Sequence, residues 1–119
     1  CIQALKDGYD FVFVHIEAPD ECGHRNEMMN KVRSIELIDE KIIGPVISEL
    51  EGYDDYKIMA LADHPTPLSL RTHTRDAVPF VIYQKGDVGN NQTNFTEETA
   101  SKTGIFYEKG TLLADAFMK

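Results

Sequence analysis

The sequence predicts an α/β fold in which helices pack on a sheet. Three runs of β-branched, aromatic and other apolar residues, at positions 11–16, 57–62 and 78–83, are typical of buried strands. Between the first two runs, apolar residues recur every three or four positions from Met28 to Leu50, which indicates one face of a long amphipathic helix. Strands that alternate with helical segments are the pattern of an α/β sheet.

The first residues resemble the last turn of a helix, closed by Gly8 as its C-cap. The chain has no initiator Met and no basic-then-apolar signal pattern at its start. We therefore expect it to be the C-terminal piece of a longer protein. A sheet of three strands is thin, which agrees with partners that lie outside this chain.

Composition excludes two classes of partner. A net charge of −8 leaves no basic stripe to meet phosphates, which argues against nucleic acid. No stretch approaches the roughly 20 apolar residues that a membrane span needs. The two cysteines, Cys1 and Cys22, do not suggest a disulfide framework, and we expect Cys22 to be a small buried residue rather than a ligand.

Glycine and proline mark the limits of the first elements. Residues 11–16 are apolar without alternation, which favours a strand covered on both faces, as in a parallel sheet. In the long helix the pair Gly44-Pro45 removes a backbone hydrogen bond and predicts a kink or a break. Gly52 marks the end of that helix.

The elements predicted in the second half of the chain are shorter than the long helix of the first half. Pro-Thr-Pro at 65–67 forbids regular strand pairing and predicts a loop. Pro79 indicates that the third strand either begins there or is an edge strand. Residues 85–94 are polar and contain glycine, so we expect a loop there and the segment most prone to disorder. A short helix over 96–102, capped by Asn94 or Thr96, precedes a last helical face made by Leu112, Leu113, Ala116 and Phe117.

Carboxylates and imidazoles gather at three places next to predicted strands. Asp20 and His24 are four residues apart, Asp63 and His64 end the second strand, and His73 precedes the third. Oxygen and nitrogen ligands of this kind suit zinc, manganese and similar ions. Each pair also has a simpler interpretation as a hydrogen-bonded surface pair, and Asp20 alone would serve as the cap of the following helix.

Three motifs occur in a fixed order: Pro19-Asp20-x-x-Gly23-His24, then Ala62-Asp63-His64, then His73-Thr74 followed by Val78-Pro79-Phe80. In this order they resemble the alkaline phosphatase superfamily, and more narrowly the archaeal-type branch of cofactor-independent (2,3-bisphosphoglycerate-independent) phosphoglycerate mutase. The resemblance covers nearly the whole chain. It implies that residues 1–119 are the C-terminal portion of the metal-binding, phosphatase-like domain, an incomplete part of an alkaline-phosphatase-like sheet.

The resemblance also implies a ligand set and a reaction. Asp20, His24 and His73 would hold one divalent ion, and Asp63 and His64 would help to hold a second, with manganese as the expected metal and zinc or magnesium as alternatives. The complete protein would interconvert 2- and 3-phosphoglycerate through a phosphoserine in glycolysis and gluconeogenesis, in the cytoplasm. The nucleophilic serine would lie upstream, so we expect no catalytic nucleophile in this chain and no activity from it alone.

Two other functions stay open. A metal-dependent phosphatase or another phosphomutase of the same superfamily would carry the same metal motifs, because substrate choice would lie outside this chain. Alternatively, the chain by itself is an inert folded module. Without partner strands we also expect it to expose apolar edges and to self-associate.

Overall fold

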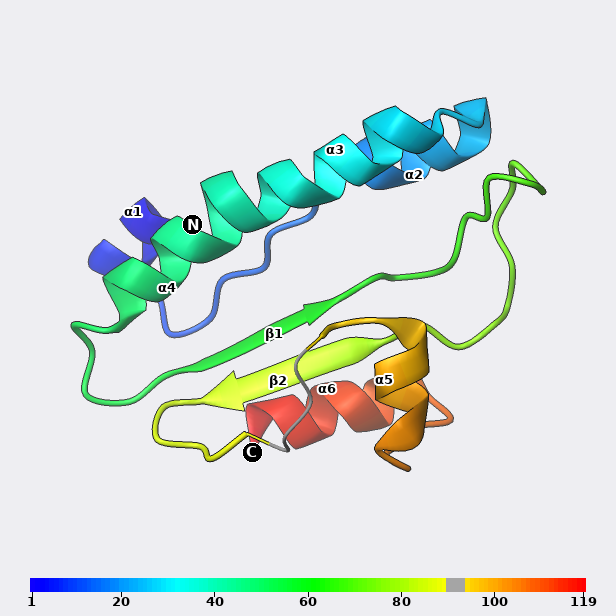
Figure 1. Ribbon diagram of the computed structural model, residues 1–119. Helices are drawn as coiled ribbons and strands as arrows, with labels where there is room; N and C mark the ends of the chain where they lie inside the picture. The colour runs from blue at the N-terminus through cyan, green and yellow to red at the C-terminus, as the bar shows by residue number, and fades with distance from the viewer. Residues whose placement is uncertain (90–93) are drawn as a thin grey trace. The chain divides into compact units, whose positions relative to one another are not determined.

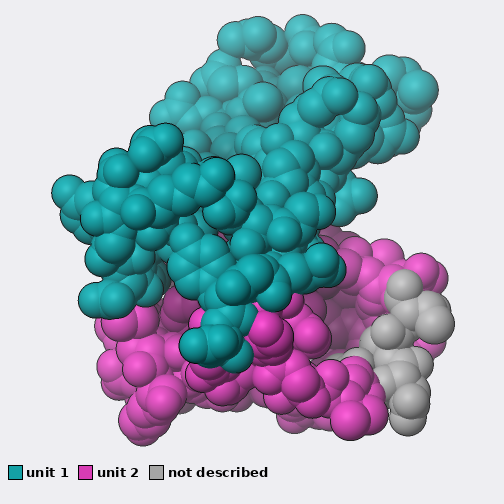
Figure 2. All heavy atoms as spheres, turned by 90° about the vertical axis from the view of Figure 1, so that its left-hand side faces the viewer, with its two compact units in different colours: residues 1–54, 65–74 teal, residues 55–64, 75–119 magenta. Residues whose placement is uncertain are grey.

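The computed structural model describes residues 1–89 and 94–119. These residues form two compact units (Figure 2). Unit 1 comprises residues 1–54 and 65–74, and unit 2 comprises residues 55–64 and 75–119. Residues 65–74 come between the two strands in the sequence and yet belong with the helices of unit 1.

Unit 1 is helical. Its elements are α1 (Ile2–Lys6), α2 (Ala18–Arg25), α3 (Met28–Ile38), the π-helical segment η1 (Asp39–Ile43) and α4 (Gly44–Leu50), as Figure 1 shows. The helix predicted at the start of the chain is confirmed, and Gly8 follows it with a φ of 91°, a left-handed conformation that glycine adopts without strain. An ion pair of 3.2 Å between Lys6 Nζ and Glu49 Oε2 joins α1 to α4.

The predicted interruption of the long helix is a π turn. The Gly44 N–H donates to the Asp39 carbonyl, five residues back, instead of four. Pro45, the next residue, has no N–H to donate, and the helix continues past it to Leu50. The chain therefore bridges the proline without a break, and α3, η1 and α4 follow one another as one long helix (Figure 1).

Unit 2 contains the sheet. Strands β1 (Lys57–Leu61) and β2 (Phe80–Gln84) are antiparallel, with Lys57 opposite Gln84 and Leu61 opposite Phe80. The helices α5 (Glu97–Lys102) and α6 (Gly110–Met118) complete the unit. Lys57 Nζ donates a 3.1 Å hydrogen bond to the Phe117 carbonyl, which satisfies one of the open carbonyls at the end of α6.

The strand predicted over residues 11–16 is wrong. In the part of the chain that the structure describes, only β1 and β2 form a sheet, and residues 11–17 are neither helix nor strand. Phe11 and Phe13 are exposed, the latter by 74%. The apolar run indicated a tendency to be buried, but a strand also needs a partner for its backbone hydrogen bonds, and residues 11–16 pair with neither β1 nor β2. The parallel pairing expected from this run is likewise not found among them, since the pair present is antiparallel.

The bounds of the other predicted strands and helices hold within a few residues, although β1 and β2 are half-buried rather than buried. β2 begins at Phe80, directly after Pro79, which cannot donate to the ladder. Thr96 caps α5: its side chain accepts from the Thr99 N–H, and the Thr99 hydroxyl accepts from the Thr96 N–H. The predicted loop at 85–94 has no helix or strand over 85–89 and 94, and its residues 90–93 lie outside the described residues.

Little apolar surface is fully buried. Among the described residues the buried apolar side chains are Val46, Leu50 and Leu113, whereas Met28 and Ile35 at the other end of the long helical stripe are more than half exposed. None of the helices in the described ranges combines the length and the apolar character that crossing a bilayer requires.

Candidate metal centre

Helix α2 presents Asp20 and His24 on one face. The two residues are four positions apart, and His24 Nε2 lies 3.2 Å from Asp20 Oδ2. Pro19 lies in the first turn, where the absence of an N–H costs nothing, and Asn26 ends the helix with a φ of 57°. The N-cap is Glu17, so the alternative in which Asp20 caps the helix is wrong.

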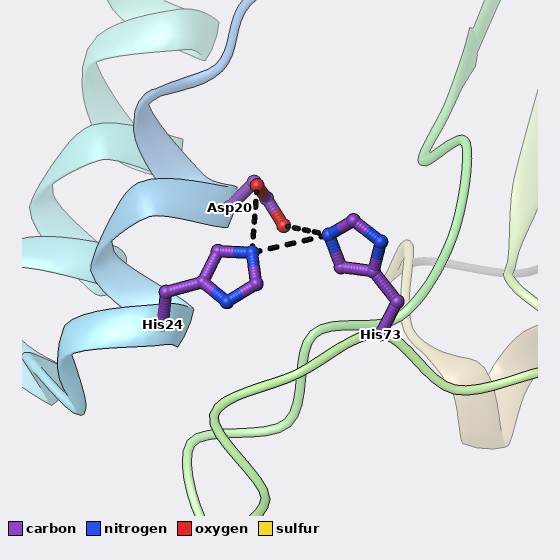
Figure 3. Close-up of side chains that lie close together, drawn as sticks. All are labelled: Asp20, His24 and His73. Carbon is purple, nitrogen blue, oxygen red and sulfur yellow. Dashed lines mark hydrogen bonds and ion pairs between the residues drawn. The ribbon is translucent and has the colours of Figure 1, made fainter.

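The loop at residues 65–74 carries the third member of the cluster, His73. Its ends are joined by a 3.1 Å hydrogen bond from the Thr74 N–H to the Pro65 carbonyl. Within the loop, the Arg71 N–H donates to the Pro67 carbonyl at 2.9 Å, and Arg71 has a left-handed φ of 55°. These bonds fold the loop back on itself and place His73 opposite α2 (Figure 3).

The three side chains meet in one compact cluster, in which the two carboxylate oxygens of Asp20 face different histidines (Figure 3). His24 Nε2 lies 3.1 Å from His73 Nε2, and His73 Nε2 lies 3.3 Å from Asp20 Oδ1. The imidazole rings are 4.9 Å apart between centroids and inclined by 48°. Residues that are far apart in the sequence thus bring two ring nitrogens and a carboxylate to a single point.

A backbone carbonyl orients the His24 ring. Nδ1 of His24 lies 2.9 Å from the Arg71 carbonyl oxygen, which can only accept, so Nδ1 carries the hydrogen. In the neutral ring this leaves the lone pair on Nε2, the atom that faces Asp20 and His73. Metal-binding histidines commonly have their second nitrogen fixed in this way, which sets both tautomer and orientation.

The donor set fits a divalent cation. A carboxylate and two imidazole nitrogens that face one another need a shared hydrogen or a cation between them. Bonds of about 2.0–2.2 Å hold the ligands of a metal ion about 3.0–3.6 Å apart, depending on the geometry. The observed separations of 3.1, 3.2 and 3.3 Å fall in this range. The side chains are 31–50% exposed, which leaves room for a further ligand, as in catalytic sites.

A glycine allows the loop to approach α2. Gly23 is buried, and a Cβ built on it would lie 2.6 Å from the Thr66 carbonyl oxygen and 2.9 Å from Lys31 Nζ. Both distances are shorter than real Cβ contacts, so position 23 excludes any side chain while Thr66 stays in place. Glycine inside a helix costs about 1 kcal/mol relative to alanine. Its presence here is explained by this close packing.

Asp63 and His64, the other two predicted ligands, lie in unit 2. His64 Nε2 is 3.3 Å from Asp63 Oδ2, and the Asp63 carboxylate accepts the His64 backbone N–H. They thus form a pair at the end of β1, as the sequence predicted. Their role as ligands of a second ion stays a prediction.

Other residues near the site have simpler roles. Glu21 pairs with Arg25 at 2.7 Å on the exposed side of α2. His15 is exposed and stacks on Phe13. Cys22 is free and half-buried. Sequence reasoning missed the carbonyl of Arg71, since any residue could supply it.

The comparisons agree with these observations. The model of the metalloenzyme superfamily matches residues 1–118. The chain is 42% identical over 104 residues to a 2,3-bisphosphoglycerate-independent phosphoglycerate mutase of Methanosarcina acetivorans, covering 87% of this chain and 26% of the relative. It is 38% identical over 120 residues to the protein of that name from Methanosarcina barkeri, covering 99% of this chain and 30% of the relative.

A solved structure is also similar. The PH0037 protein from Pyrococcus horikoshii matches with a TM-score of 0.75 and 35% identity, over 85% of this chain and 30% of that one. This chain therefore spans between about a quarter and a third of the length of the relatives that it matches.

The packing at Gly23 gives a first prediction, for the complete protein that contains this sequence. Gly23→Ala should displace the 65–74 loop, because the nearest atom to the new methyl group, at 2.6 Å, is the backbone carbonyl oxygen of Thr66. We expect a loss of about 1–3 kcal/mol of unfolding free energy and weaker binding of Mn²⁺, measured by urea unfolding and by calorimetric titration.

Gly44→Ala is the matched control. It also lies in a helix, but its nearest neighbour, the Asp39 carbonyl oxygen, is 3.4 Å from the added Cβ. Alanine should be neutral there or stabilise by up to about 1 kcal/mol. Equal effects of the two substitutions on Mn²⁺ binding would contradict the role assigned to Gly23.

Proposed function

Because this chain belongs to the metalloenzyme superfamily, we propose that it is the C-terminal, metal-binding portion of a phosphoglycerate mutase that interconverts 2- and 3-phosphoglycerate. The single observation that supports this most is the meeting of Asp20, His24 and His73, because phosphoryl transfer of this kind needs positive charge next to the phosphoryl oxygens. The names of the similar proteins indicate the same reaction.

In this proposal each residue of the centre has a defined task. Asp20 supplies the negative charge that offsets a divalent cation, and His24 and His73 supply neutral nitrogens. The Arg71 carbonyl keeps the His24 lone pair directed into the centre. When bound, the cation would favour deprotonation of a coordinated hydroxyl and stabilise the charge that develops on the transferred phosphoryl group.

We further propose that Asp63 and His64 help to hold a second divalent ion, with manganese as the metal at both sites and zinc or magnesium as alternatives. Carboxylate and imidazole ligands suit all three, so the donor set supports a class of metal rather than one element. The substrate is a small anionic metabolite, and we place the enzyme in the cytoplasm.

Two of the four serines of this chain, Ser34 and Ser101, make local hydrogen bonds that do not resemble those of an activated nucleophile. The hydroxyls of Ser34 and Ser101 donate to the carbonyls of Lys31 and Glu98, three residues earlier in their helices. We therefore propose that the nucleophilic serine lies outside residues 1–119, together with the groups that select the substrate.

A metal-dependent phosphatase or another phosphomutase of the same superfamily is the second candidate. The metal residues alone favour none of the three activities, because each places positive charge around a transferred phosphoryl group. The products distinguish them. A mutase converts 3-phosphoglycerate to 2-phosphoglycerate without releasing inorganic phosphate, whereas a phosphatase releases it.

The second prediction concerns the centre itself. In the complete protein, His73→Ala should lower mutase activity by about 100-fold or more and weaken Mn²⁺ binding, because a ligand is lost while the buried core is untouched. His15→Ala is the matched control, since His15 is exposed and contacts Phe13 rather than the centre. Calorimetric titration with Mn²⁺ and an assay with 3-phosphoglycerate report the two effects. Normal Mn²⁺ binding by His73→Ala would show that Asp20, His24 and His73 have a structural role and do not bind the metal.

The third prediction concerns the isolated chain. Residues 1–119 alone should produce neither 2-phosphoglycerate nor inorganic phosphate from 3-phosphoglycerate in the presence of Mn²⁺, because the chain lacks the proposed nucleophile. Phosphorus NMR of the reaction mixture detects both products at once. Turnover by the isolated chain would mean that one of its own residues attacks the phosphate.

A further inference from the structure

Thr66 connects the loop to the candidate metal centre. Its hydroxyl donates a hydrogen bond to Asp20 Oδ1, the oxygen that lies 3.3 Å from His73 Nε2. Thr66 is only 5% exposed and is the buried polar side chain among the described residues. A part-buried hydrogen bond to a charged acceptor is stronger than one between neutral groups on the surface, so this contact constrains the carboxylate.

The sequence around Thr66 fixes its backbone. It stands between Pro65 and Pro67, and a residue before proline is restricted to extended conformations. Its own β-branched side chain has few rotamers. The hydroxyl therefore has little freedom before any ion binds, and the loop loses little entropy in presenting it.

A lysine from the neighbouring helix also binds Thr66, through the Thr66 backbone. Lys31 Nζ, in α3, donates a part-buried hydrogen bond of 2.7 Å to the Thr66 carbonyl oxygen. Gly23 of α2 leaves the space in which this carbonyl and the lysine meet. Thr66 is thus bonded through its side chain to α2 and through its backbone to α3.

We propose that Thr66 is a positioning residue of the metal centre, whose hydroxyl sets the orientation in which the Asp20 carboxylate meets a divalent cation, with Lys31 holding Thr66 in place. The bond occupies one lone pair on Oδ1 and opposes rotation of the carboxylate, so that its remaining lone pairs face His24 and His73. This inference rests on the proposed function, since it assumes that the cluster binds a metal.

The test is Mn²⁺ binding by the complete protein, followed by electron paramagnetic resonance, which distinguishes free from bound Mn²⁺. Because two metal sites are proposed, Mn²⁺ binding to the Asp20, His24 and His73 site is identified as the binding that is lost in His73→Ala. Thr66→Val keeps the shape and loses the hydroxyl, and it should weaken that binding by about 10- to 100-fold. Thr66→Ser restores a hydroxyl and should bind within about threefold of the wild type. Thr72→Val, at an exposed position of the same loop, is the matched control and should change nothing.

A second measurement separates positioning from packing. The rise in melting temperature on adding Mn²⁺ should be smaller in Thr66→Val than in the wild type, because the carboxylate is less well oriented for the ion. The melting temperature in chelator should also fall, but only as far as the loss of one part-buried hydrogen bond requires. If the valine variant does not fold, Thr66→Ala and Thr66→Ser form a pair that differs in the hydroxyl alone and answers the same question.

Two results would overturn the inference. Mn²⁺ affinity of Thr66→Val within twofold of the wild type, with His73→Ala impaired, would exclude the positioning role and leave the metal centre intact. If Mn²⁺ affinity falls equally in Thr66→Ser and Thr66→Val, the hydroxyl is not responsible and the effect comes from packing. Normal binding by His73→Ala would instead refute the proposed metal centre, so the two failures are distinguishable.

Discussion

The close approach of the 65–74 loop to helix α2 is the constraint on which the candidate centre depends. Gly23 has no side chain, so the Thr66 carbonyl oxygen can lie 2.6 Å from the position that a Cβ would otherwise occupy. This contact brings the Thr66 hydroxyl to Asp20 and the Arg71 carbonyl to His24. The loop therefore supplies one residue of the candidate centre and also orients the two residues that α2 supplies, so the three are not arranged independently.

The sequence predicted the local parts of this arrangement and missed the long-range ones. The spacing of Asp20 and His24 follows from the helical repeat, and residues 65–67 are a loop because proline forbids anything else. That His73 joins them depends on the Thr74 to Pro65 hydrogen bond, which any residue pair could make, so resemblance to a family was the only available signal.

The same distinction explains the error at residues 11–16. Apolar composition indicates a tendency to be buried, whereas a strand also depends on which edge is available. The Gly44-Pro45 pair was correctly predicted to disturb the long helix, yet proline chemistry alone does not specify whether a helix breaks, kinks or widens. The structure shows that the helix widens into a π turn at η1, which is defined by the hydrogen bond from the Gly44 N–H to the Asp39 carbonyl.

The π turn also fixes an angular relation within the long helix. Each residue of an α-helix advances by about 100° around the axis. Deleting one residue from η1 would therefore turn the end that carries Lys31 by about that angle relative to the end that buries Val46 and Leu50. The extra residue of the π turn thus sets the rotation of one end of the helix relative to the other. With this rotation Lys31 reaches the Thr66 carbonyl while Val46 and Leu50, at the far end, are buried.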